Sequence, residues 1–102
     1  MDIIFSREAA DNLRERYTVL ELETFDVEGQ TLETFCVVPA EKIFMEMQDL
    51  PTNVKLHEQL VQAIKDKNVK LCMDLSEVLK GRFGGELDSF YDIIQERFAL
   101  EQ

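Results

Sequence analysis

The sequence is poor in the residues that most often build catalytic and metal sites: it has one histidine, two cysteines and no tryptophan. A single histidine, His57, excludes any mechanism or metal site that requires two. Cys36 and Cys72 have neither the spacing of a metal site nor that of a redox pair. We therefore expect two buried, reduced thiols, and no disulfide, metal or cofactor.

Basic residues are also scarce, because 11 lysines and arginines stand against 21 acidic residues and give a net charge of −10. Such a chain is repelled by nucleic-acid backbones and by anionic membranes. No apolar run approaches the ~20 residues that a membrane span requires, and the first residues lack the basic character of a signal peptide. We expect a cytoplasmic protein that binds neither nucleic acid nor membrane directly.

The negative charge is unevenly distributed along the chain. Residues 1–50 contain twelve acidic and four basic residues, whereas residues 54–82 contain four acidic and six basic ones. The acidity therefore belongs mainly to the first half and, again, to the segment after Phe83. This pattern favours a basic or neutral protein as the partner.

Residues 17–38 carry the clearest structural signal, which is that of a central β-hairpin. Two runs of β-branched and aromatic residues flank a turn at Asp26-Val27-Glu28-Gly29, and Pro39 ends the second run. Asp at the first and Gly at the fourth turn position favour a three-residue loop over a two-residue Glu28-Gly29 loop, in which Glu28 would need a positive φ. The preferred loop pairs Leu20 with Cys36, and places Leu20, Leu22, Leu32, Cys36 and Val38 on one face as core.

The second face of this hairpin is neither plainly solvated nor plainly buried. Three glutamates interrupt its apolar residues, and the three-residue loop sets Glu23 opposite Glu33, a like-charge pair that counts against this register. We expect this face to meet a partner, a second copy of the chain or the last helix. Its apolar residues are Tyr17, Val19, Phe25, Phe35 and Val37.

Helices are predicted around the hairpin, and residues 3–5 are predicted as a short edge strand. Residues 69–73 fit either a strand or the first turn of a helix, and we favour the helix because its apolar stripe continues to Leu79. The glycine-rich residues 81–85 are read as a hinge or loop. The predicted helices run from Arg7 to about Arg16 after the N-cap Ser6, from Pro39 to before Pro51, from Thr52 or Asn53 to Lys67, from Val69 to Lys80, and through Leu87, Phe90, Tyr91, Ile94 and Phe98.

This order of elements predicts a single α+β domain over residues 1–102, with a two- or three-stranded antiparallel sheet packed with four to five α-helices. Two or three strands leave sheet edges and one sheet face that something must cover.

No pattern in the sequence indicates catalysis. Glu58 is adjacent to His57 and not three or four residues away, so it does not supply a carboxylate on the same helix face. We therefore interpret His57 as a partly exposed surface residue. Acidic pairs such as Asp88 with Asp92 are typical of a solvated helix face. The glycine-rich segment lacks both the P-loop ending and the spacing of a dinucleotide fingerprint.

The sequence therefore favours a small acidic protein-interaction module, acting as a regulator, adaptor or chaperone-like factor without catalytic activity, with a protein partner or as a homodimer. One alternative is an inhibitor whose carboxylates mimic a nucleic-acid backbone, and another is a small enzyme that uses carboxylates. The residues expected to contact the partner are Val19, Phe25, Phe35, Val37, Met45, Phe90 and Tyr91.

Overall fold

The structure is a computed structural model that describes residues 1–101, and it has the predicted α+β fold. Its antiparallel sheet contains β1 (Asp2–Ile4), β2 (Thr18–Val27) and β3 (Gln30–Val38), in the order β1-β3-β2. The helices are α1 (Arg7–Leu13), α2 (Ala40–Ile43), α3 (Leu50–Lys65), α4 (Val69–Leu79) and α5 (Asp88–Ala99), with short 3-10 turns at η1 (Phe44–Glu46) and η2 (Phe83–Gly85).

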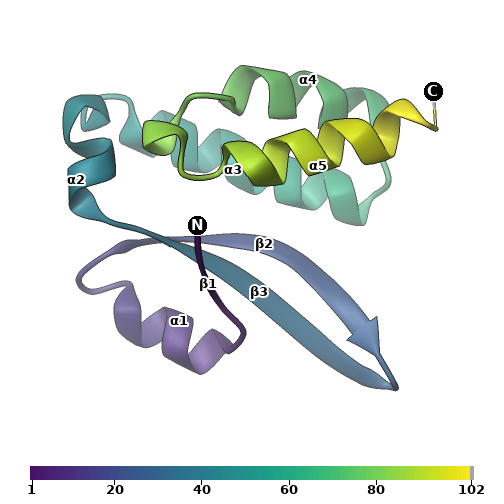
Figure 1. Ribbon diagram of the computed structural model, residues 1–102, viewed down its shortest axis with the longest axis horizontal. Helices are drawn as coiled ribbons and strands as arrows, with labels where there is room; N and C mark the ends of the chain where they lie inside the picture. The colour runs from purple at the N-terminus through teal and green to yellow at the C-terminus, as the bar shows by residue number, and fades with distance from the viewer. Residues whose placement is uncertain (102) are drawn as a thin grey trace.

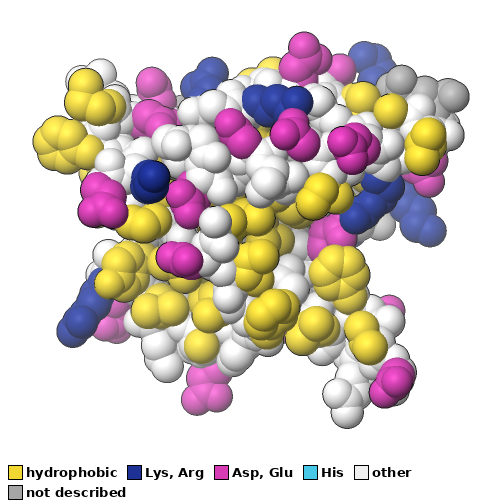
Figure 2. All heavy atoms as spheres, in the orientation of Figure 1, with side chains coloured by type: hydrophobic (Ala, Val, Ile, Leu, Met, Phe, Trp, Pro, Cys, Tyr) yellow, Lys and Arg dark blue, Asp and Glu magenta, His cyan; other side chains and the backbone are white. Residues whose placement is uncertain are grey.

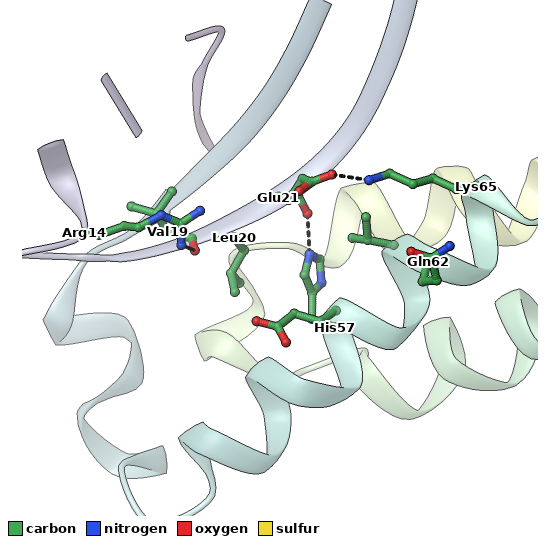
Figure 3. Close-up of a pocket in the computed structure, with 9 residues that line it drawn as sticks. Arg14, Val19, Leu20, Glu21, His57, Gln62 and Lys65 are labelled. Atoms are coloured by element: carbon green, nitrogen blue, oxygen red, sulfur yellow. Dashed lines mark hydrogen bonds and ion pairs between the residues drawn. The ribbon is translucent and has the colours of Figure 1, made fainter. Parts of the chain in front are cut away.

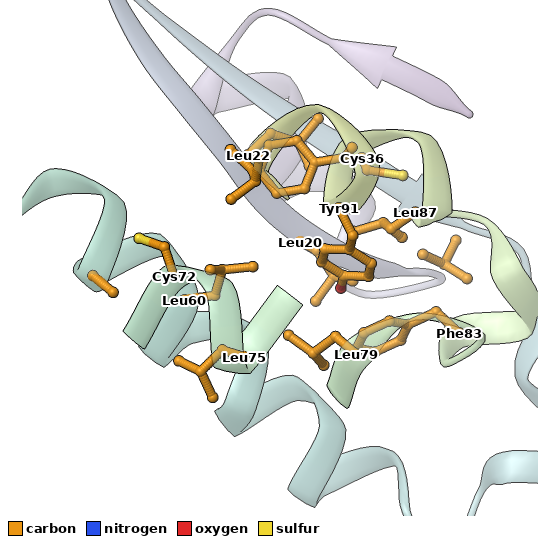
Figure 4. Packing of buried hydrophobic residues seen from close by; sticks show 14 of the residues in the cluster. Leu20, Leu22, Cys36, Leu60, Cys72, Leu75, Leu79, Phe83, Leu87 and Tyr91 are labelled. Carbon is orange, nitrogen blue, oxygen red and sulfur yellow. The ribbon is translucent and has the colours of Figure 1, made fainter. Parts of the chain in front are cut away.

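The sheet is sandwiched between helices on both of its faces. Figure 1 shows α3, α4 and α5 as one layer on one side of the hairpin and α1 on the other side. The main core lies between the sheet and the three-helix layer, and Figure 4 shows Leu20, Leu22 and Cys36 facing the helices there. The predicted core face of the hairpin is thus confirmed, with Leu32 half-buried at its far end. The helices contribute Leu60, Cys72, Leu75, Leu79, Phe83, Leu87, Tyr91 and Ile94.

The second face of the hairpin is covered by the chain's own α1. Val19 and Phe35 are buried there against Ala10 of α1, in a small cluster separate from the main core. Ser6 caps this helix, since its side-chain oxygen accepts from the backbone N–H of Ala9. The predicted cap is confirmed, although the helix ends at Leu13 instead of about Arg16.

The predicted three-residue hairpin loop is wrong. The structure has the two-residue loop Glu28-Gly29, and both residues have positive φ, 51° and 81°. By itself this loop would shift the pairing by one residue, but the shift is reversed further along by a β-bulge between Glu21 and Thr24. Leu20 therefore still pairs with Cys36, as predicted.

The bulge places Leu22 and Glu23 together opposite Thr34, whose side chain satisfies the irregular backbone. The Thr34 hydroxyl donates to the Glu23 carbonyl at 2.7 Å and accepts from the Glu23 N–H at 3.2 Å. The predicted Glu23 and Glu33 pair does not form, because Thr24 faces Glu33. Beyond the bulge the alternation of β2 is inverted, so Phe25 lies on the helix side of the sheet instead of the predicted second face.

The helix after Pro39 is shorter than predicted. α2 stops at Ile43, η1 follows, and α3 begins at Leu50 with Pro51 in its first turn, where a missing N–H does no harm. Ile43 is buried, whereas Phe44 and Met47, beyond the end of α2, lie exposed.

The ambiguous residues 69–73 are helical, as favoured from the sequence. Asn68 acts as the N-cap of α4, because its side-chain oxygen accepts from the Leu71 N–H. The glycine-rich segment is held in place by Glu46, whose carboxylate accepts from the backbone N–H groups of Phe83 and Gly84.

Candidate functional site

His57 is fully buried, so its interpretation as a partly exposed surface residue is wrong. Figure 3 shows the ring pointing from α3 toward Glu21 on β2. The His57 Nε2 lies 2.6 Å from the Glu21 backbone carbonyl oxygen, and Nδ1 lies 2.9 Å from the Tyr91 hydroxyl. The ring therefore connects α3 with both β2 and α5.

These contacts define the state of the imidazole. A carbonyl oxygen only accepts, so Nε2 carries the proton and donates to Glu21, while the Tyr91 hydroxyl donates to Nδ1. Burial lowers the pKa of His57, which favours the neutral ring. Both ring nitrogens are thus occupied inside the protein, and the Nε2 contact covers part of the edge of β2.

A cavity of about 230 Å³ lies beside His57, between the outer edge of β2 and α3. Both cations that line it, Arg14 and Lys65, have partners within the molecule. The Arg14 guanidinium donates to the Val19 carbonyl at 3.1 Å, and the Lys65 Nζ lies 2.9 Å from a carboxylate oxygen of Glu21. The cavity therefore presents no unpaired cation to a ligand.

A second hollow, the apolar groove, is the strongest candidate for a functional site. It has a volume of about 300 Å³ and is walled by β1, the distal half of the hairpin and α5. Figure 2 shows hydrophobic side chains gathered on this face, between the helix layer and the sheet. It is lined by Met1, Ile3, Phe5, Leu22, Phe25, Phe90 and Ile93, with Glu23, Thr34 and Arg97 as its polar members.

Five apolar side chains of the groove are exposed to solvent: Met1, Ile3, Phe5, Phe25 and Ile93 are 42%, 43%, 60%, 44% and 51% exposed. For Ile3, Phe25 and Ile93 the local cause of this orientation differs. In β1 alternation turns Ile3 toward the helices, in β2 the bulge turns Phe25 the same way, and α5 has an apolar arc broader than one core stripe needs.

The polar members of the groove are paired with each other. The Glu23 carboxylate is only 9% exposed and forms an ion pair with Arg97 of α5. This ion pair ties the bulge to the last helix and leaves the apolar part of the groove unobstructed.

The structure distributes the seven predicted contact residues over several places. Val19 and Phe35 are buried under α1 and Tyr91 is buried in the main core, so these three offer no surface in this fold, whereas Val37 is half-buried beside α1. Phe25 and Phe90 line the apolar groove. Met45 projects from η1 and is 92% exposed beside Phe44, at a separate corner of the molecule.

Sequence reasoning missed Ile3, Phe5 and His57. The buried stripe of α3 is continued by Asn53 and His57 at helical spacing before Leu60, and that periodicity was the available signal for His57. For Ile3 and Phe5 no such signal exists, because two exposed apolar residues near a chain end fit many environments.

The prediction of two buried thiols is confirmed. Cys36 and Cys72 are buried free thiols, and burial raises the pKa of both, that of Cys36 to about 12. Within residues 1–101 no group of three His, Cys, Asp or Glu side chains is arranged to hold a metal ion. None of the helices in this part of the chain combines the length and apolar composition needed to cross a bilayer.

Comparison of the chain with protein-family models, with curated proteins and with solved structures found no significant match.

Proposed function

We propose that this protein is a small acidic interaction module, a regulator, adaptor or chaperone-like factor, whose apolar groove holds a segment of a partner protein. The observation that carries the proposal is the convergence of Ile3, Phe5, Phe25 and Ile93, from three separate parts of the chain, around one groove. Leaving apolar side chains clustered in water is unfavourable, and such patches commonly mark binding sites.

The ion pairs of the hairpin favour this function over charge mimicry. Mimicry needs free carboxylates on one continuous surface, yet Glu21 is paired with Lys65, Glu23 with Arg97 and Glu33 with Arg7. Three central carboxylates of the hairpin are thus already neutralised within the molecule.

The test is selection of binding peptides from a random 12-residue library displayed on phage, with the wild-type protein as bait. Each selected peptide is then measured against Phe25→Ser and Ile93→Ser. Val78→Ser is the matched control for Ile93→Ser, because Val78 lies on α4 outside the groove and has nearly the same exposure, 49% against 51%.

We expect the selected peptides to lose at least about tenfold in affinity for the two groove variants and to bind the Val78→Ser variant normally, since each lost apolar contact is worth ~1–2 kcal/mol. Thermal unfolding of every variant verifies that the fold is retained. Peptides that bind all variants equally, or the absence of any selected peptide, would overturn the proposed function.

A further inference from the structure

The two edges of the sheet, formed by β2 and β1, differ in whether side chains occupy their outward backbone groups. On β2, the outward carbonyls of Val19 and Glu21 each accept a hydrogen bond from a side chain, from Arg14 and His57 respectively. Native sheets cover exposed edges in such ways to prevent pairing with another strand. The β2 edge is therefore closed to strand addition in this stretch.

The register shows which groups face outward on the other edge. Val19 and Glu21 direct their backbone groups away from β3, so Leu20 and Cys36 form the hydrogen-bonded pair between these strands. The residues on either side of Cys36 in β3, Phe35 and Val37, therefore direct their backbone N–H and C=O groups toward β1, where they pair with Ile4 and Asp2. It follows that the N–H and C=O of Ile3 point away from the sheet.

In the described part of the chain, no element forms hydrogen bonds along the edge at Ile3. Among residues 1–101, β1 has β3 as its strand neighbour, and neither side-chain nor backbone hydrogen bonds from another element reach Ile3. The Ile3 side chain lies in the apolar groove. An unpaired donor and acceptor therefore stand directly beside exposed apolar surface.

The segments that wall the groove are strongly acidic. Residues 1–5, 22–34 and 86–97 carry nine carboxylates, against one basic side chain, Arg97, and the N-terminal ammonium of Met1, which pairs with Glu86. Arg7 and Lys80 approach from outside these segments and pair with Glu33 and Asp92, which still leaves a clear excess of negative charge. The complementary occupant is basic.

From this geometry we infer that the groove takes an extended, basic segment of another protein, which adds to β1 as a fourth strand. Its backbone pairs with the N–H and C=O of Ile3, alternate apolar side chains enter the groove beside Ile3 and Phe5, and the remaining side chains are lysine or arginine. This inference rests on the proposed function and names the chemistry of the partner and its mode of binding.

A second copy of the chain is the less suitable occupant. It would bring the same acidic segments against each other across the open edge, whereas a basic strand neutralises them. The solution mass of the wild type and of the Ile3 variants described next, measured by light scattering, distinguishes a second copy from a basic partner.

The probe is an acetylated and amidated peptide of nine residues in which lysine and valine alternate, and its control has glutamate in place of lysine. Ile3→Pro removes the outward N–H of Ile3, which an edge strand tolerates because that N–H bonds to no other strand. Ile3→Ala is the matched control, because it shortens the side chain and keeps the N–H. Circular dichroism verifies the fold of both variants.

We expect the lysine peptide to bind the wild type, with affinity that falls as salt is raised, and the glutamate peptide to bind at least about tenfold more weakly. The Ile3→Pro variant should bind the lysine peptide at least about fivefold more weakly than the Ile3→Ala variant does, since a hydrogen bond is lost. In the wild type, hydrogen exchange of the Ile3 amide should slow when the peptide is added, and this readout holds even if the proline variant fails to fold.

The inference is overturned if the lysine peptide does not bind, or if both Ile3 variants bind it equally and the Ile3 amide exchanges at an unchanged rate. A different result is that library peptides lose affinity for the Phe25→Ser and Ile93→Ser variants and yet bind the Ile3→Pro and Ile3→Ala variants equally. That result would overturn strand addition and leave the proposed function standing. A dimer that dissociates in the Ile3→Pro variant would assign the edge to a second copy and overturn the basic partner.

Discussion

The imidazole Nε2 of His57 donates to the backbone carbonyl oxygen of Glu21 over 2.6 Å, so a buried side chain of α3 closes the edge of strand β2. Arg14 does the same for Val19 two residues earlier. These two contacts leave β1 as the edge that lacks such protection, and they make the state of His57 a determinant of stability.

We expect the stability of the protein to fall as the pH is lowered through the range in which histidine titrates. Burial lowers the pKa of His57 in the folded protein, whereas the unfolded chain has the ordinary value of about 6.5 and binds more protons below it. The stabilisation is thus fully present above about pH 6.5 and is lost as the pH falls through the folded-state pKa. Urea unfolding at about pH 7.5, 6.5 and 5.5 measures this slope.

The variant His57→Phe is the control for that slope. It should have a smaller change in the free energy of unfolding over the same pH range. At about pH 7.5 it should be less stable than the wild type, by about 1–3 kcal/mol for each of the two partners left unsatisfied, the Glu21 carbonyl and the Tyr91 hydroxyl. An unchanged slope in this variant would assign the pH dependence to another group.

The bulge should depend on the Thr34 hydroxyl. Thr34→Val keeps the shape of the side chain and removes both hydrogen bonds to the Glu23 backbone, so we expect a loss of about 1–3 kcal/mol in the free energy of unfolding. Thr31→Val, on the same strand but exposed, should cost less than about 0.5 kcal/mol. Equal losses for the two variants in denaturant unfolding would show that the bulge does not need this side chain.

The two-residue loop makes a prediction that the three-residue loop does not. Glu28 has a φ of 51°, a conformation that asparagine adopts more readily than glutamate. Glu28→Asn should therefore stabilise the hairpin by about 0.5–1 kcal/mol. Glu28→Gln serves as a control for the change in charge. A loss of stability in the asparagine variant, measured by thermal unfolding, would argue for the other loop.

The ion pair between Glu23 and Arg97 should matter more through its buried carboxylate than through its exposed cation. Arg97→Met leaves the Glu23 carboxylate largely buried without a partner, which we expect to cost about 1–3 kcal/mol. Adding Glu23→Gln should restore at least half of that loss, because the residual charge is removed. A double variant that is less stable than Arg97→Met alone would contradict this account; denaturant unfolding compares them.

Local patterns were sufficient to predict the elements around which the chain folds. The hairpin, the cap at Ser6 and the helical state of residues 69–73 follow from interactions within a few residues, so periodicity and capping residues predict them. The pairing of Leu20 with Cys36 was predicted with the wrong loop and holds because the bulge reverses the shift. Even where the loop was wrong, the apolar alternation of β3 indicated the correct core face, since burial dominates register.

The sequence by itself determined the α+β class, the hairpin and its core face, because these depend on alternation and propensity along the chain. Only the tertiary structure decided that α1 covers Val19 and Phe35, that His57 is buried at a sheet edge, and that a bulge turns Phe25 into a groove with Ile3 and Ile93. Those features depend on contacts between residues far apart in sequence, whose energies no local pattern carries.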